Sequence, residues 1–121
     1  MANILVVDDS GMSRRTLRRI LEPAGHTVIE AEDGIAALER YFIDKPDLVL
    51  LDLTMSGMYG IEVLSRLREM DSNAVVIVAS ADIQSSTRNM ARDAGACDFI
   101  NKPFDVDQVL NAVARAIQGG R

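Results

Sequence analysis

The sequence predicts an α/β fold, in which five βα units follow one another and form a doubly wound, five-stranded parallel sheet with helices on both faces. One observation is that short apolar runs alternate with segments of helical apolar spacing along the whole chain. Another is that the runs at 4–7, 48–51 and 74–79 contain no polar residue. Strands without polar alternation are buried on both faces, as the central strands of a parallel sheet are. A chain of 121 residues has the size of one domain.

The first half of the chain divides into three strands and two helices. In order, these are a strand at 4–7, a helix at 12–21, a strand at 27–29, a helix at 35–42 and a strand at 48–51. Pro23 and Gly25 end the first helix, and the second closes before Pro46, because proline does not continue a helix. The strand at 27–29 is short and only weakly apolar, so we expect it near an edge of the sheet.

The second half continues the alternation with three helices and two strands. In order, these are a helix at 61–67, a strand at 74–79, a helix at 83–94, a strand at 99–100 and a helix at 106–117. Gly95 is expected to end the fourth helix. Asp105 is placed to cap the fifth, which is amphipathic and which Gly119 and Gly120 terminate.

Composition and charge exclude several classes of protein. The chain is 48% hydrophobic and 26% charged, which is typical of a globular domain. No apolar run approaches the roughly 20 residues of a membrane helix, and no signal peptide is visible, so we expect a cytoplasmic protein with no membrane partner. The net charge of −5 argues against nucleic-acid binding. The single cysteine, Cys97, has no second thiol, and we expect a small buried side chain.

Polar residues stand where the predicted strands end. They are Asp8, Asp9, Asp52, Ser80 and Lys102. In the flavodoxin-like strand order 2-1-3-4-5, the third strand lies between the first and the fourth, and ligands bind at the carboxyl ends of the strands. Asp52 is therefore expected between the acid pair on one side and Ser80 with Lys102 on the other. Taken singly, an aspartate or Ser80 could cap a helix, and a lysine is usually exposed.

Three carboxylates at one point predict a metal ion. Close carboxylates raise one another's pKa unless a cation joins them. Oxygen ligands without histidine or cysteine select a hard ion such as Mg²⁺, which also accepts a phosphoryl oxygen. The Ser80 hydroxyl and the Lys102 ammonium would complete a site for an anion. This set predicts phosphoryl transfer to a carboxylate, which gives an aspartyl phosphate.

The phosphoryl donor is predicted to be another molecule. Neither a GxGxxG nor a GxxxxGK[ST] pattern occurs, so the chain lacks a phosphate cradle of its own. The one histidine, His26, begins the second predicted strand and therefore lies at the opposite edge of the sheet, where we expect a surface position.

The motifs VVDDSG, LLDLTMSGMYG, VASAD and DFINKPF, in this order and spacing, resemble the receiver domain of two-component response regulators over essentially the whole chain. The resemblance implies that Asp52 is the phosphoacceptor and that Lys102 contacts the phosphoryl group. It also implies that Mg²⁺ is held by Asp8, Asp9 and Asp52 together with the backbone carbonyl of Thr54.

The same resemblance implies a conformational switch built on Ser80 and Phe99. On phosphorylation Ser80 would turn to hydrogen-bond a phosphoryl oxygen, and Phe99 would fill the space it leaves. The movement would remodel the face formed by the fourth helix, the fifth strand and the fifth helix, as a two-state equilibrium biased by a local charge. The Lys102–Pro103 bond is expected to be cis.

Two positions depart from the family's pattern. Ser56 stands where the family usually has proline, which predicts a more mobile loop after Asp52. Phe99 lacks the hydroxyl of the tyrosine found in many relatives, so its inward rotation would make no new hydrogen bond. Thr54 and Asp82 match positions that flank the path of the hydrolytic water, and we expect this pair to set the lifetime of the phosphate.

The resemblance also implies the partners. The phosphodonor would be a histidine kinase or a phosphotransfer protein. The output would be a downstream protein such as a flagellar motor switch, as in chemotaxis, or a phosphorelay partner. We expect residues 1–121 to form a single monomeric receiver domain without an output domain. It would be no enzyme beyond its own phosphorylation and slow self-dephosphorylation.

Three alternatives stay open at the level of sequence. A Mg²⁺-dependent phosphatase of the haloacid dehalogenase type would need a second aspartate where Thr54 stands. A flavodoxin-like nucleotide binder would need a phosphate loop where the acid pair stands. The chain is alternatively a receiver taken from a longer regulator.

Four arginines are clustered on the first predicted helix. They are Arg14, Arg15, Arg18 and Arg19. Their spacing places them on one face, which is either simply solvated or a docking surface for the kinase or phosphotransfer partner.

Overall fold

The computed structural model describes residues 1–54, 59–81 and 84–119. Strands and α-helices alternate along the chain. In order they are β1 (Asn3–Val7), α1 (Gly11–Leu21), β2 (Thr27–Ala31), α2 (Gly34–Asp44), β3 (Leu48–Leu51), α3 (Gly60–Met70), β4 (Val76–Ser80), α4 (Ser85–Asp93), β5 (Asp98–Asn101) and α5 (Val106–Gly119), with a short 3₁₀ turn, η1 (Glu22–Ala24), after α1. The predicted α/β fold is confirmed.

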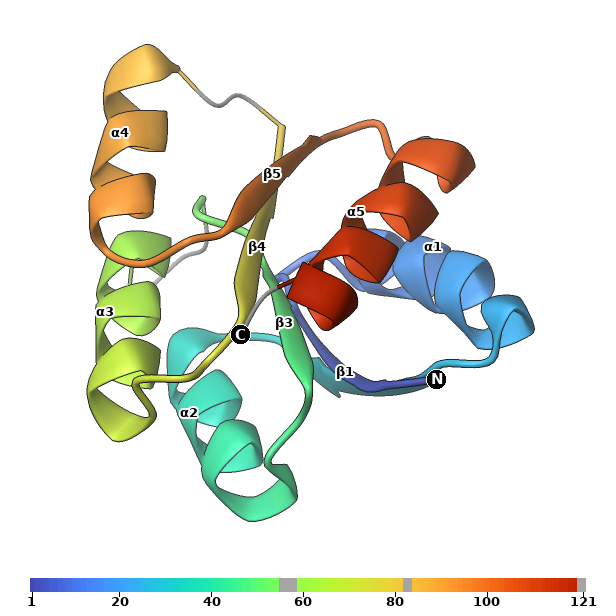
Figure 1. Ribbon diagram of the computed structural model, residues 1–121, viewed down its shortest axis with the longest axis horizontal. Coiled ribbons are helices and arrows are strands. Elements are labelled where there is room, and N and C mark those ends of the chain that lie inside the picture. The colour runs from blue at the N-terminus through green and yellow to red at the C-terminus, as the bar shows by residue number, and fades with distance from the viewer. Residues whose placement is uncertain (55–58, 82–83, 120–121) are drawn as a thin grey trace.

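The sheet has the predicted order, β2-β1-β3-β4-β5, and every neighbouring pair of strands is parallel. The strand at 27–29, predicted at an edge, is part of β2 and forms one edge. In Figure 1, α1 and α5 lie on one side of the sheet and α2, α3 and α4 on the other. Both faces of the central strands are therefore covered by helices.

Two hydrophobic cores explain why the central strands carry no polar alternation. Along β1, Leu5 and Val7 belong to the core under α2, α3 and α4, whereas Ile4 and Val6 belong to the core under α1 and α5. The same alternation continues along β3 and β4. Since successive side chains of a strand point to opposite faces, each face needs its own apolar set.

Polar side chains begin three of the helices. The Ser10 hydroxyl accepts from the N–H of Ser13 at the start of α1. Asp33 caps α2, and Asp105 accepts from the N–H of Gln108 at the start of α5, as predicted. Ser10 rather than Asp8 or Asp9 therefore caps α1, so the acid pair is left for another role.

Several local predictions need correction. Strand β4 begins at Val76 rather than at 74. The fourth helix runs over Ser85–Asp93 rather than 83–94, and Ala91 is its buried residue, whereas Met90 is 57% exposed. Cys97 is exposed rather than buried, because it precedes edge strand β5, where its N–H donates to Val76 O. Ile83 lies outside the described residues.

Gly60 holds the start of α3 against the backbone that follows β3. A Cβ atom at this position would lie 2.4 Å from Leu53 Cα and 2.7 Å from Asp52 O, neither of which can move without moving the strand end. Gly60→Ala is therefore expected to lower the free energy of unfolding by about 1–3 kcal/mol, as overpacking does. Urea denaturation measures this change.

Gly119→Ala is the matched control, because its added Cβ would meet nothing within 4 Å. It should leave the urea midpoint unchanged or slightly raised. Equal urea midpoints for Gly60→Ala and the parent protein would show that the start of α3 is not closely packed against the backbone of Asp52 and Leu53.

No helix in residues 1–54, 59–81 and 84–119 is long and apolar enough to cross a membrane.

Candidate functional site

The predicted polar residues meet at the carboxyl edge of the sheet. Asp8 follows β1, Asp52 follows β3, Ser80 is the last residue of β4, and Lys102 follows β5. Backbone hydrogen bonds continue the sheet into this edge, because Asp52 N donates to Val7 O at 2.9 Å and Lys102 N donates to Ser80 O at 3.0 Å. The sheet itself therefore sets the spacing of these side chains.

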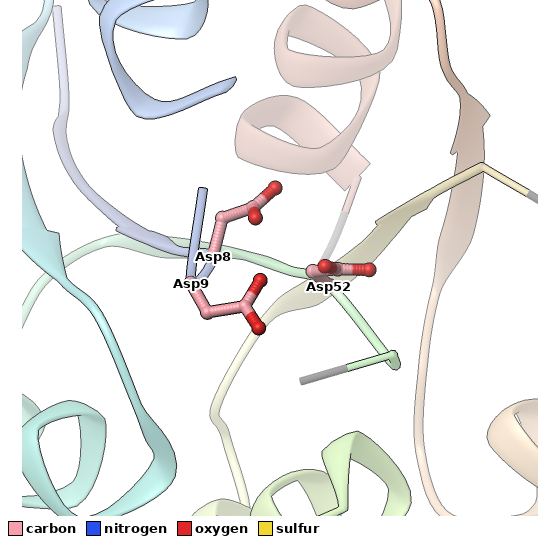
Figure 2. Close-up of side chains that lie close together, drawn as sticks. All are labelled: Asp8, Asp9 and Asp52. Atoms are coloured by element: carbon pink, nitrogen blue, oxygen red, sulfur yellow. The ribbon is translucent and has the colours of Figure 1, made fainter. Parts of the chain in front are cut away.

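Three carboxylates form a cluster, which Figure 2 shows at the ends of β1 and β3. One ligand oxygen from each of Asp8, Asp9 and Asp52 lies within 4.8 Å of the others. Asp8 and Asp52 are each only 2% exposed, whereas Asp9 is exposed to solvent. Carboxylate oxygens are the ligands that hard divalent cations prefer. The cluster can therefore hold a metal ion of that class, with access from the Asp9 side.

Lys102 bridges the two buried carboxylates. Its Nζ lies 2.8 Å from Asp8 Oδ2 and 3.7 Å from Asp52 Oδ2. Burial lowers the pKa of Lys102, but the hydrogen bond to Asp8 and the charge of Asp52 outweigh burial and hold that pKa above its ordinary value. The ammonium is therefore positively charged at neutral pH beside the carboxylate of Asp52.

Burial raises the pKa of the Asp8 carboxyl, and the hydrogen bonds from Lys102 and from Ser10 N–H offset only part of that effect. The negative charge of Asp52 raises it further. Burial and the neighbouring carboxylate thus both disfavour the charged form of Asp8, and a bound divalent cation would offset both effects.

Asp52 is held by donors from two directions. Its Oδ1 accepts from Ser80 Oγ at 2.6 Å, from Thr54 N at 3.2 Å and from Thr54 Oγ1 at 3.1 Å. The Ser80 hydroxyl in turn accepts from Leu53 N at 2.8 Å. The Ser80 hydroxyl thus donates directly to the carboxylate that the sequence predicts as the phosphoacceptor. Ser80 does not cap α4, since that helix follows Gln84.

Phe99 connects β5 to α4. Its ring packs against the core under α2, α3 and α4, and two α4 arginines lie over it, with Cζ of Arg88 at 4.8 Å and Cζ of Arg92 at 5.4 Å from the ring centroid. These distances are within the range of cation–π attraction. A change in the position of this ring would therefore directly alter the contacts that α4 makes with β5.

Two residues with predicted roles, Ser56 and Asp82, lie outside the described residues. The predicted cis bond between Lys102 and Pro103 is confirmed. His26 is half-buried just before β2, at the edge of the sheet opposite the site, where its Nδ1 accepts from Ala2 N at 3.2 Å. It is therefore not placed to donate a phosphoryl group to Asp52 in the same molecule.

The structure divides the four arginines of α1 into two pairs. Arg14 and Arg18 both donate to the carboxylate of Glu30 on β2, each through Nε at 2.8 Å. Arg15 and Arg19 are exposed. The arginines therefore differ in environment: the side chains of Arg14 and Arg18, 18% and 36% exposed, are paired with Glu30, whereas Arg15 and Arg19 are exposed residues. Sequence spacing could not reveal this division, because Glu30 comes from a different element.

Comparisons with known proteins show the family of this chain. The model of the response regulator receiver domain matches residues 4–114. The chain is 43% identical to the chemotaxis protein CheY of Bacillus subtilis over 94% of this chain and 96% of the relative. It is 36% identical to sporulation initiation phosphotransferase F of the same organism, over 93% and 90%.

Among solved structures, the fold matches a chain in the CheX–CheY–BeF3–Mg²⁺ complex from Borrelia burgdorferi. The TM-score is 0.90 at 38% identity, over 94% of this chain and 87% of that one. The chain belongs to the response regulator receiver domain family, whose members are signalling switches controlled by phosphorylation.

Proposed function

We propose that this protein is a signalling switch that accepts a phosphoryl group on Asp52 from a partner protein in a Mg²⁺-dependent reaction. The observation that carries the proposal is the buried Asp52 carboxylate, which has the acid pair on one side and Lys102 on the other. A carboxylate nucleophile between a cation site and an ammonium is the arrangement that phosphoryl transfer requires.

The residues of the chain have distinct parts in the proposed transfer. A carboxylate oxygen of Asp52 attacks phosphorus, and the bond from phosphorus to the donor breaks. Lys102, 3.7 Å from Asp52 Oδ2, is near enough to neutralise charge on a transferred phosphoryl oxygen. The Ser80 hydroxyl, 2.6 Å from Oδ1, needs only a small rotation to donate to the phosphoryl group. Thr54 and Asp82 are proposed to control attack by water and so the lifetime of the product.

Magnesium is the metal that we propose for the carboxylate cluster. Asp8, Asp9 and Asp52 are the side-chain ligands, with the Thr54 carbonyl as a further ligand. A bound Mg²⁺ ion would supply positive charge beside the oxygens of the transferred group. The related CheX–CheY–BeF3–Mg²⁺ complex from Borrelia burgdorferi supports this assignment.

The conformational effect of phosphorylation is proposed to be transmitted to the surface through Phe99. A phosphoryl group adds nearly two negative charges beside β4 and β5. In this proposal Ser80 turns from Asp52 Oδ1 to a phosphoryl oxygen, and the Phe99 ring turns inward into the space that Ser80 leaves, away from Arg88 and Arg92. The face of α4, β5 and α5 then changes for a partner that reads it. No new hydrogen bond accompanies the turn, since Phe99 has no hydroxyl.

The partners follow from the family and from the exposed arginines. The phosphodonor is proposed to be a histidine kinase or a phosphotransfer protein, with Arg15 and Arg19 in its docking surface. Relatives named as CheY support a chemotaxis output, and the relative named as a phosphotransferase supports a phosphorelay. We propose the chemotaxis role, acting as a monomer in the cytoplasm, because several of the most similar curated relatives carry the name CheY.

Incubation with acetyl phosphate tests the proposed function without any partner. In the presence of Mg²⁺, intact mass should increase by one phosphoryl group, and the increase should disappear when EDTA removes the metal. Labelling that is equally fast in EDTA would contradict a metal-dependent reaction. Failure to label at any Mg²⁺ concentration, with a folded protein, would contradict the proposed function itself.

A further inference from the structure

We propose that Arg14 is a positioning residue for the metal site, because its guanidinium, oriented by Glu30, fixes the peptide group that joins Asp8 to Asp9. This inference rests on the proposed Mg²⁺ site. It adds a residue on α1 and a residue on β2 to a site built from the ends of strands.

The contacts of Arg14 carry the proposal. Its Nε donates to Glu30 Oε1 at 2.8 Å and its Nη1 donates to the backbone carbonyl of Asp8 at 2.7 Å. The Arg14 side chain is only 18% exposed. The guanidinium is a rigid planar fork, so a partner on one side of the fork fixes the direction of the other side.

Asp8 is also tied to β2 through the preceding peptide group, which joins Val7 to Asp8. Asp8 N donates to Ala31 O at 3.1 Å, and Glu30 lies one residue earlier on that strand, in register with Val6. Strand β2 therefore holds Asp8 twice, directly through its N–H and through Arg14 at its carbonyl. The first tie continues the sheet, whereas the second depends on a side chain of α1.

The carbonyl of Asp8 matters because it belongs to the peptide bond that leads into Asp9. That bond is planar, so a fixed carbonyl oxygen also fixes the amide nitrogen of Asp9 and the direction in which its Cα leaves. Asp8 is otherwise held through its buried side chain by Lys102 and Ser10 N–H. Arg14 thus orients the peptide bond between the buried ligand Asp8 and the exposed ligand Asp9.

The charge of Arg14 and its positioning role predict opposite changes in Mg²⁺ affinity when Arg14 is removed, and this makes the inference testable. Arg14 places a positive charge beside a cluster that must bind a cation, so its removal should strengthen Mg²⁺ binding if charge were all that mattered. Glu30 and Glu22 balance the charges of Arg14 and Arg18 in one network of ion pairs. If Arg14 positions the acid pair, its removal should weaken Mg²⁺ binding instead.

Arg18 provides a matched control. Its Nε donates to Glu30 Oε2 at 2.8 Å, so it has the same charge and the same partner as Arg14 on the same helix. Arg18 also donates to Glu22 and to Val28 O, away from the acid pair. Arg14→Gln and Arg18→Gln therefore remove the same charge from Glu30, but only the first removes the hydrogen bond to the Asp8 carbonyl.

The experiment measures Mg²⁺ affinity by isothermal titration calorimetry and the urea midpoint for the full chain and for the two variants. Loss of outer contacts to metal ligands typically costs 10–100-fold in affinity. Arg14→Gln is expected to weaken Mg²⁺ binding by about 10-fold, toward the low end of that range because Asp8 keeps its side-chain contacts. Arg18→Gln should bind as tightly as the parent protein or more tightly, with a similar urea midpoint to Arg14→Gln.

Two further measurements separate positioning from general damage. The amide ¹⁵N signal of Asp9 should move in Arg14→Gln and stay in Arg18→Gln, since this nitrogen shares a peptide group with the Asp8 carbonyl. Arg14→Lys keeps the positive charge but lacks the planar guanidinium that joins Glu30 to the Asp8 carbonyl. This variant should therefore also bind Mg²⁺ more weakly than the parent protein.

Equal Mg²⁺ affinity in Arg14→Gln and Arg18→Gln, or parental affinity in Arg14→Lys, would overturn the positioning role while leaving the metal site intact. Absence of Mg²⁺ binding in the parent protein would instead overturn the proposed site and this inference with it.

Discussion

Asp52→Asn is expected to accept no phosphoryl group from acetyl phosphate in the presence of Mg²⁺. The amide has no anionic oxygen to attack phosphorus, and it removes one of the three carboxylates of the metal cluster. Its oxygen can still accept from Ser80 Oγ and Thr54, so the local structure should survive. Intact mass after incubation measures the outcome, and the unlabelled variant should keep a cooperative urea transition.

Asp47→Asn is the control for this variant. Asp47 directly precedes β3, where its carboxylate accepts from Asn3 N, so it lies at the end of the strand opposite to Asp52 and outside the site. It should label as fast as the parent protein. Labelling of Asp52→Asn at the parental rate would contradict the assignment of Asp52, whatever the behaviour of the control.

Mg²⁺ is expected to stabilise the parent protein and to lose this effect in Asp9→Ala. An ion that binds only the folded state adds about 2.7 kcal/mol of stability at a concentration 100 times its dissociation constant. The two proteins should differ in the part of their stability that Mg²⁺ adds, because only the parent protein keeps all three carboxylates of the cluster. Urea denaturation in EDTA and in saturating Mg²⁺ measures both effects.

Glu32→Ala is the control, since Glu32 is another exposed acid and is not part of the carboxylate cluster. It should keep the full stabilisation by Mg²⁺. A parental response to Mg²⁺ in Asp9→Ala would show that the acid pair is not the metal site.

The sequence was sufficient for the fold because local signals and sheet topology agree. Apolar runs without alternation required a sheet covered on both faces, and the flavodoxin-like order assumed for it, one of the common orders of such sheets, matches the observed order. The same order brought Asp8, Asp52, Ser80 and Lys102 to one edge, as the structure shows. Residues at strand ends are easy to place, because the backbone of the sheet fixes them.

Side-chain partners between elements were harder to predict. Helical spacing placed Arg14 and Arg18 on one face but could not reveal Glu30 on β2. The orientation of Ser80 toward Asp52 depends on the N–H of Leu53, a contact between neighbouring strands that no local pattern encodes. Cys97 shows a different limit, since a small apolar residue at an edge strand is exposed as readily as buried. These failures concern tertiary contacts rather than the period of any element.

The central claim, that Asp52 carries the phosphoryl group, is tested most directly by locating the modified residue. An aspartyl phosphate is an acyl phosphate, so borohydride reduces it to the alcohol level, and peptide mass spectrometry then locates the reduced residue. After incubation with acetyl phosphate and Mg²⁺, we expect homoserine at position 52 and unmodified aspartate at positions 8 and 9. A reduced residue at position 8 or 9, or a phosphate on Ser80, Thr54 or His26 that survives borohydride, would contradict the account.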